Sequence, residues 1–182
     1  MTQKKSEARL EKLFWIDMEM TGLDVQKEGI IECAVLITNL QFDVLEQFES
    51  VVFQPPLLLE AMDEWNKQHH RDSGLTEKVP KGKPLDEVEN QLIRMAQKHF
   101  PDPRNRPVLA GNSIAQDRLF IEKYMPRFAQ LLHYRTLDVS SWKLIFQNRF
   151  YQKYEKKNAH RALEDILESV AELKFYLSFI QA

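Results

Sequence analysis

The chain has 182 residues, of which 43% are hydrophobic and 29% are charged. This balance is typical of a globular rather than a disordered protein and predicts one domain, residues 1–182, with a single large core. A formal net charge of −2 argues against a protein that grips long nucleic acid through a basic surface. Any nucleic-acid partner should therefore be short, or be held in a small pocket.

The sequence also narrows the cellular setting. It contains no run of about 18 apolar residues, so we expect neither a membrane span nor a membrane partner. Residues 1–11 are polar and charged, which predicts a mobile N-terminus rather than a signal peptide. Cys33 is the single cysteine, which excludes a disulfide framework. Together these features predict a cytoplasmic protein.

Hydrophobic periodicity predicts strands and helices in a definite order along the chain. Strands are expected at residues 12–18, 29–38, 44–53, 108–112 and 133–138. Helices are expected at residues 57–66, 84–99, 113–124, 139–148 and 160–180, with a further segment from Pro126. Ser113 is the predicted N-cap of its helix. A three-strand meander followed by strands that alternate with helices predicts an α/β layer fold.

Two acids stand at the end of the first strand. Asp17 and Glu19 are two residues apart, so in a strand their side chains share one face. Two neighbouring carboxylates repel each other and lose hydration, and a divalent cation would compensate both. Taken alone, the pair is more simply interpreted as a strand end whose acids reach solvent or pair with lysine or arginine, and only the residues downstream favour a cation.

Two further acids are expected near this pair. Asp117 follows the fourth strand on the helix face of Ser113, and sites in open α/β sheets gather at the carboxyl ends of strands. Asp165, in the last helix, faces roughly the same way as Ala162 and Ile166, so it needs a partner. The alternative for Asp165 is an ordinary acid near a helix start, stabilised by the helix dipole.

Five motifs now carry a family resemblance. They are WIDMEMTGL (15–23), MDEWN (62–66), GNSIAQD (111–117), HYRTLDVS (133–140) and HRALEDI (160–166). With His160 five residues before Asp165, the chain resembles the histidine branch of the DEDD superfamily of 3′→5′ exonucleases, and within it the oligoribonuclease family. The resemblance runs from Phe14 to about Tyr176. It implies an RNase H-like exonuclease fold with a mixed five-stranded sheet flanked by helices, two divalent cations (Mg²⁺ or Mn²⁺), and a homodimer.

The resemblance also implies a role for each site residue. Asp17, Glu19, Asp117 and Asp165 would be the metal ligands. His160 would be the general base that deprotonates the attacking water, because its neutral form is well populated near pH 7. Its alternative is a polar residue at a helix start.

The implied substrate contacts form two groups. Leu23, Trp65 and His70 would contact the terminal bases, although core packing is the alternative for Leu23 and Trp65. Ser113, Arg135 and Ser140 would form a pocket for a 5′ phosphate, a task that suits arginine. Tyr134 would reach the active site of the other protomer, as a phosphate contact or in catalysis, with an interface aromatic as its alternative.

The activity implied is a metal-dependent 3′→5′ exoribonuclease. It would split single-stranded RNA of two to about five nucleotides, dinucleotides especially, into 5′-mononucleotides in the last step of RNA degradation. Glu164 departs from the family pattern, which more often has aspartate there, and the segment between Asn148 and His160 is short. Two alternatives are a DNA proofreading exonuclease and a catalytically silent nucleotide-binding dimer. The silent dimer would be expected to have lost one of the acids.

Overall fold

The computed structural model describes residues 10–155 and 161–180. The predicted base His160 lies outside the described residues, as does most of the N-terminal segment that we expect to be mobile.

The sheet is mixed and has five strands in this part of the chain. They are β1 (Lys12–Met20), β2 (Ile30–Asn39), β3 (Val44–Val51), β4 (Leu109–Gly111) and β5 (Thr136–Asp138), in the spatial order β3-β2-β1-β4-β5. The first three strands pair antiparallel, whereas β4 pairs parallel with β1 and β5. The predicted mixed five-stranded sheet is therefore confirmed. β1 is two residues longer than expected, so Glu19 is part of the strand and pairs in register with Glu32 on β2.

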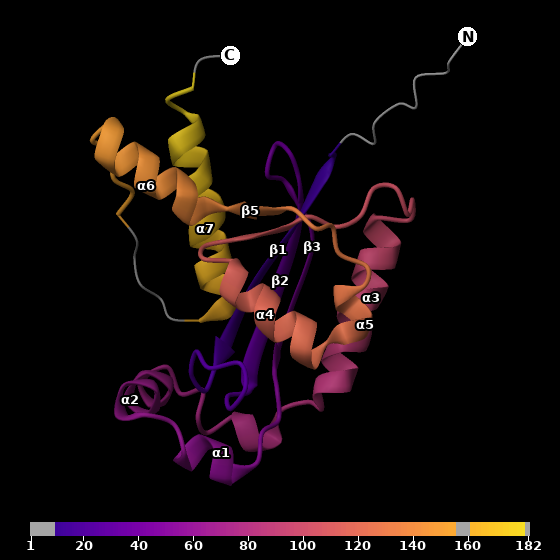
Figure 1. Ribbon diagram of the computed structural model, residues 1–182, viewed down its shortest axis with the longest axis vertical. Coiled ribbons are helices and arrows are strands. Elements are labelled where there is room, and N and C mark those ends of the chain that lie inside the picture. The colour runs from indigo at the N-terminus through magenta and orange to yellow at the C-terminus, as the bar shows by residue number, and fades with distance from the viewer. Residues whose placement is uncertain (1–9, 156–160, 181–182) are drawn as a thin grey trace.

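Helices cover both faces of the sheet (Figure 1). Their bounds are α1 (Pro56–Glu60), α2 (Glu64–Asp72), α3 (Leu85–His99), α4 (Ala115–Tyr124), α5 (Pro126–Ala129), α6 (Val139–Arg149) and α7 (Ala162–Leu177), with the 3-10 helix η1 (Val79–Lys81). α6 and α7 lie on one side of the sheet and α3 and α5 on the other, while α1 and α2 lie beyond one end of it. Within the described ranges, no helix combines the length and apolar character that crossing a membrane requires.

The alternation of β1 divides the core into two layers. Phe14, Ile16 and Met18 pack with apolar residues of α3, α4 and α5. Leu13 and Trp15 point the other way and pack with α7, and the Trp15 indole N–H donates to Thr38 Oγ1 at 3.0 Å. The next side chains on this second face are those of Asp17 and Glu19, so the predicted pairing of the two acids on one face is confirmed.

Two local predictions are wrong. The single helix expected at residues 57–66 is broken, because the Asp63 carboxylate accepts the Asn66 N–H at 2.8 Å and starts α2 as a separate helix. Ser113 does not cap α4: it has a left-handed φ of 51°, and Ile114 occupies the N-cap position. The Ser113 N–H donates instead to Asp138 and Ser140, each at 3.0 Å.

Candidate active site

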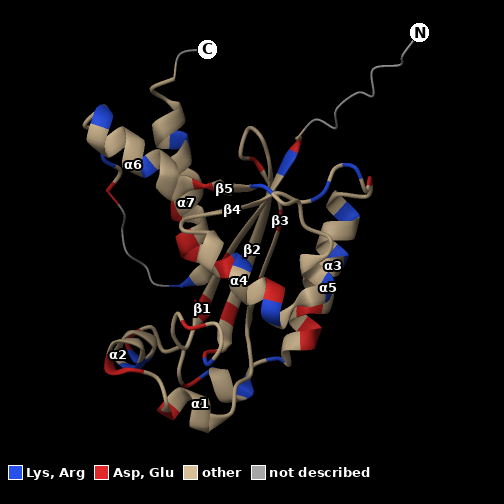
Figure 2. Cartoon of the chain, in the orientation of Figure 1, with Lys and Arg blue, Asp and Glu red and all other residues tan. Residues whose placement is uncertain are grey.

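Three of the four predicted acids meet at the junction of β1 and α7. Asp17 and Glu19 project from β1 and Asp165 from the first turn of α7, and one carboxylate oxygen of each lies within 4.8 Å of the others. Figure 2 shows acidic residues on both elements. The three side chains are half-buried, and a set of oxygen donors alone is the set that hard cations such as Mg²⁺ and Mn²⁺ prefer. This carboxylate cluster therefore fits a divalent cation.

The fourth acid, Asp117, lies beside the cluster rather than in it. β4 ends at Gly111 and pairs with β1 at Phe14 and Trp15. Beyond that point the edge of β1 faces α4, and buried Asp117 accepts the Met18 N–H there at 3.1 Å. A side chain thus takes the place of a strand partner, and it places this carboxylate next to the backbone between Asp17 and Glu19.

The surroundings raise the pKa of two of these acids. The pKa of Glu19 rises from 4.5 to about 7, first because burial removes water from its carboxylate and then because Asp165 and Glu32 are close, while Arg161 opposes the shift. The pKa of Asp117 also rises to about 7, mainly through burial, although the Met18 N–H bond opposes it. Such carboxylates hold protons near neutral pH and are poised to exchange them for a cation.

Sequence reasoning missed the acid that holds α7 in place. Glu32 on β2 is buried, and its carboxylate accepts bonds from the Arg161 Nη2 at 2.6 Å, the Arg161 Nε at 3.1 Å and the Ala162 N–H at 3.3 Å. These contacts pin the start of α7, one turn before Asp165. The available signal was an acid inside the apolar run at residues 29–38, which needs a partner once the strand is central.

Leu23 and Trp65, which we predict to contact the terminal nucleobases of the substrate, lie on two separate segments near Glu19. The exposed fractions of Leu23 and Trp65 are 77% and 69%, so core packing is excluded for both. The loop that carries Leu23 is held by α4, because the Gln116 amide donates to the Leu23 carbonyl at 2.7 Å. Trp65 stacks on His69, with ring centroids 4.7 Å apart.

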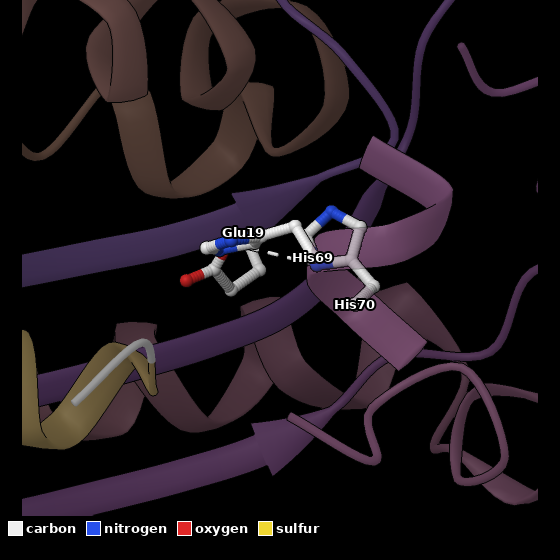
Figure 3. A group of neighbouring side chains, drawn as sticks. All are labelled: Glu19, His69 and His70. Atoms are coloured by element: carbon white, nitrogen blue, oxygen red, sulfur yellow. Dashed lines mark ion pairs between the residues drawn. The ribbon is translucent and has the colours of Figure 1, made fainter. Parts of the chain in front are cut away.

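His70 is buried between α2 and the end of β1 (Figure 3). Its Nε2–H donates to the Met20 carbonyl at 2.9 Å, and its Nδ1 lies 3.9 Å from a Glu19 oxygen. Burial lowers the pKa of His70, which favours the neutral ring. The ring is therefore fixed, with its second nitrogen toward the carboxylate cluster.

Ser113 and Ser140 come together at the ends of β4 and β5. Their hydroxyl oxygens are 3.3 Å apart, and the Asp138 carboxylate accepts the N–H groups of both residues. The Ser140 hydroxyl also donates to Asn112, which reaches Ser169 and Glu172 on α7. Sequence reasoning missed this polar network, although Ser169 and Glu172 interrupt the apolar stripe of the last helix.

Tyr134 and Arg135 lie side by side just before β5. Both are exposed, and the Arg135 guanidinium lies 5.3 Å from the centroid of the Tyr134 ring. The structure thus joins the two serines through hydrogen bonds and pairs Arg135 with Tyr134.

Comparison with known proteins gives consistent relatives. A model of the exonuclease family matches residues 14–173. The oligoribonuclease of Bordetella pertussis is 45% identical over 93% of this chain and 95% of its own length. That of Coxiella burnetii is 41% identical over 91% and 92%. The human protein "Oligoribonuclease, mitochondrial" is 41% identical over 93% of this chain and 73% of its own.

Solved structures with this architecture include Escherichia coli exonuclease I. Its complex with a dT13 oligonucleotide superposes with a TM-score of 0.67 at 14% identity, over 92% of this chain and 41% of that one. Its zinc-bound complex with single-stranded DNA gives 0.62 at 14% identity, over 93% and 41%. The chain thus spans about two fifths of exonuclease I. The likeness confirms the predicted RNase H-like exonuclease fold.

Proposed function

Because the chain belongs to the exonuclease family and, within it, to the oligoribonucleases, we propose that it is a metal-dependent 3′→5′ exoribonuclease. It hydrolyses very short oligoribonucleotides, dinucleotides especially, to 5′-mononucleotides at the last step of RNA degradation. The observation that carries this proposal is the carboxylate cluster of Asp17, Glu19 and Asp165, gathered within 4.8 Å in a chain with these relatives.

The acids would hold two divalent cations, Mg²⁺ or Mn²⁺. Asp17, central on β1, is the proposed shared ligand, with Glu19 and Asp165 on one side and Asp117 on the other. When bound, the cations activate water as a nucleophile and stabilise the leaving 3′ oxygen. The raised pKa values of Glu19 and Asp117 support this assignment, because buried carboxylates gain most from a nearby positive charge.

His160 is the proposed general base. It directly precedes Arg161, whose guanidinium is bound to Glu32 at the start of α7. That anchor supports a catalytic placement, because a base must come within hydrogen-bond reach of the attacking water to accept its proton.

The substrate is held at both ends. Leu23 and Trp65 present exposed apolar surface for terminal bases, whereas His70, the third proposed base contact, is buried with its Nδ1 3.9 Å from Glu19. At the far end, Ser113, Ser140 and Arg135 bind the 5′ phosphate, with Arg135 as the charged partner. A pocket that closes on this phosphate favours dinucleotides, and it needs no extended basic surface on a chain of net charge −2.

We propose that the protein works as a homodimer in which Tyr134 reaches the partner's active site. Tyr134 is 73% exposed, and the segment that follows β5 carries further exposed apolar side chains that a second copy would cover: Leu144, Ile145, Phe150 and Tyr151. Sedimentation at working concentration tests this, and a monomer would contradict the role of Tyr134. The proposed location is the cytoplasm, and cell fractionation would show whether a mitochondrial pool exists, as the human relative's name suggests for that protein.

The first experiment compares substrate lengths. The protein is incubated with 5′-phosphorylated RNA of two, five and fifteen nucleotides, and with a deoxy dinucleotide, in Mg²⁺ or EDTA. We expect fast, metal-dependent cleavage of the ribo-dinucleotide and slow loss of the fifteen-mer. Equal rates at all lengths would overturn the phosphate pocket, a preference for the deoxy dinucleotide would favour a DNA exonuclease, and RNA binding without product would favour a silent scaffold.

A further inference from the structure

One ring nitrogen of the buried His70 makes no hydrogen bond to any described residue. His70 is 2% exposed, and its Nε2–H donates to the Met20 carbonyl at 2.9 Å, so its Nδ1 carries a bare lone pair. Among the described residues no hydrogen bond reaches Nδ1, and a Glu19 oxygen lies 3.9 Å away. Metal-binding histidines commonly donate their other ring N–H to a backbone carbonyl, which fixes the tautomer in this way.

His69 supplies a further donor atom at the same place. One ligand atom each from Glu19, His69 and His70 lies within 4.8 Å of the others. Consecutive helix residues point about 100° apart, so two adjacent histidines do not ordinarily converge. Here the His69 ring stacks on Trp65 and meets the His70 ring at an interplanar angle of 75°, with centroids 5.3 Å apart. Figure 3 shows Glu19 from β1 reaching both imidazoles of α2.

We propose that Glu19, His69 and His70 form a second cation site, for a borderline transition-metal dication such as Zn²⁺, and that its occupation competes with the carboxylate cluster for Glu19. Two imidazole nitrogens and one carboxylate oxygen form a donor set that suits Zn²⁺, whereas Mg²⁺ prefers oxygen donors alone. Tetrahedral Zn²⁺ places its donors about 3.3 Å apart. The His70 Nδ1 and the Glu19 oxygen, now 3.9 Å apart, therefore need to approach by only about 0.6 Å.

Competition follows because Glu19 belongs to both groups. A cation on the histidine side draws the Glu19 carboxylate away from Asp17 and Asp165. This second half, inhibition by Zn²⁺, rests on the proposed function. The binding half stands on the geometry of the three ligands and needs no enzymatic activity.

The test is titration calorimetry of Zn²⁺ into the full chain in excess Mg²⁺, with the visible spectrum of Co²⁺ as a second readout. We expect one Zn²⁺ per chain. His69→Gln and Glu19→Gln should each weaken binding at least about tenfold. Asp165→Asn should bind Zn²⁺ as the unmodified chain does, because it alters the carboxylate cluster alone. His99→Gln is a matched control: His99 pairs with Glu46 at 2.6 Å but belongs to neither three-residue group.

Each outcome decides the proposal. No Zn²⁺ uptake in excess Mg²⁺, or equal binding after His69→Gln and Glu19→Gln, overturns the site. Loss of binding in Asp165→Asn places the Zn²⁺ in the carboxylate cluster and overturns it as well. If Zn²⁺ binds through His69 without inhibiting RNA cleavage, the competition is wrong while the site holds. A chain without RNA-cleaving activity would remove the proposed function and leave the binding result intact.

Discussion

The carboxylate cluster and the proposed substrate surface lie around the same end of β1, but they are built in opposite ways. Asp17, Glu19 and Asp165 are half-buried, and the helix that carries Asp165 is tied to β2 by the buried carboxylate of Glu32. Leu23 and Trp65 are largely exposed on a loop and a short helix. The contrast teaches that neighbouring acids need a rigid frame to hold them together against their repulsion, whereas residues that receive a substrate must leave surface open.

The largest difference between the two regions should appear when one acid is removed from the carboxylate cluster. Asp17→Asn should lower kcat about a thousandfold or more, because loss of metal binding costs several kcal/mol of transition-state stabilisation. In EDTA its free energy of unfolding should match or exceed that of the unmodified chain, since a repulsive charge is gone. Stopped assays and urea unfolding measure the two quantities. Asp86→Asn, which removes an exposed acid from the first turn of α3, should leave kcat unchanged and cost at most about 1 kcal/mol of stability through the helix dipole.

Because the acids are buried close together, the free energy of unfolding should depend on pH. The folded chain keeps a proton on Glu19 up to about pH 7, whereas the unfolded chain releases it near 4.5. In EDTA, the free energy of unfolding should therefore fall by roughly 3 kcal/mol from pH 4.5 to 7 through this group and then level off. Urea titrations should show a shallower fall for Glu19→Gln, in which the Asp117 contribution remains. Parallel curves for the two proteins would contradict the assignment.

Two similar buried Glu–Arg pairs, one beside the carboxylate cluster and one remote from it, allow the effect of lost stability to be distinguished from the effect on kcat. Glu32 and Glu89 are both buried, and each accepts an arginine Nη2 at 2.6 Å. Glu32 also accepts one backbone N–H, that of Ala162, and Glu89 accepts two, those of Arg127 and Phe128. Glu32→Gln and Glu89→Gln should each cost about 2–3 kcal/mol of stability. Only Glu32→Gln should also lower kcat, by about tenfold, because it loosens the start of α7 beside the acids. Equal effects on kcat would show that Glu32 has no positioning role.

On the substrate side, the loss should appear in KM. Arg135→Gln should raise KM for a 5′-phosphorylated dinucleotide about tenfold or more, because a charge-assisted bond to phosphate is lost. The same dinucleotide without its 5′ phosphate is the control and should show little change. If both substrates lose equally, Arg135 acts elsewhere.

The smallest effect is expected at the exposed aromatic. Trp65→Ala should raise KM about fivefold, near the lower end of what one stacked base contributes. Its free energy of unfolding should stay nearly constant, because 69% of Trp65 is exposed. A large loss of stability would instead return Trp65 to a structural role.

The sequence correctly predicted those features of the site that depend only on residues close together in the chain. Alternation placed Asp17 and Glu19 on one face of β1, and helical spacing placed Asp165 beside the buried Ala162 and Ile166. The break between α1 and α2 was missed because apolar spacing continues across Asp63, where a side-chain cap overrides it. Glu32 and Arg161 could not be paired from sequence, because 129 positions separate them and the contact exists only once α7 packs on the sheet.

Cys33, in β2, makes the rate at which the fold opens around it measurable. The thiol is fully buried, and burial together with Asp117, Asp17 and Glu32 raises its pKa above the usual range. The Cys33 side chain packs in the core layer formed with α3, α4 and α5. Alkylating reagents attack thiolates, so labelling must wait until this layer opens and water enters. Because the sequence contains a single cysteine, the labelling rate reports openings around Cys33 without an introduced tag. Comparing that rate with and without Mg²⁺ measures how strongly a bound cation holds this region closed.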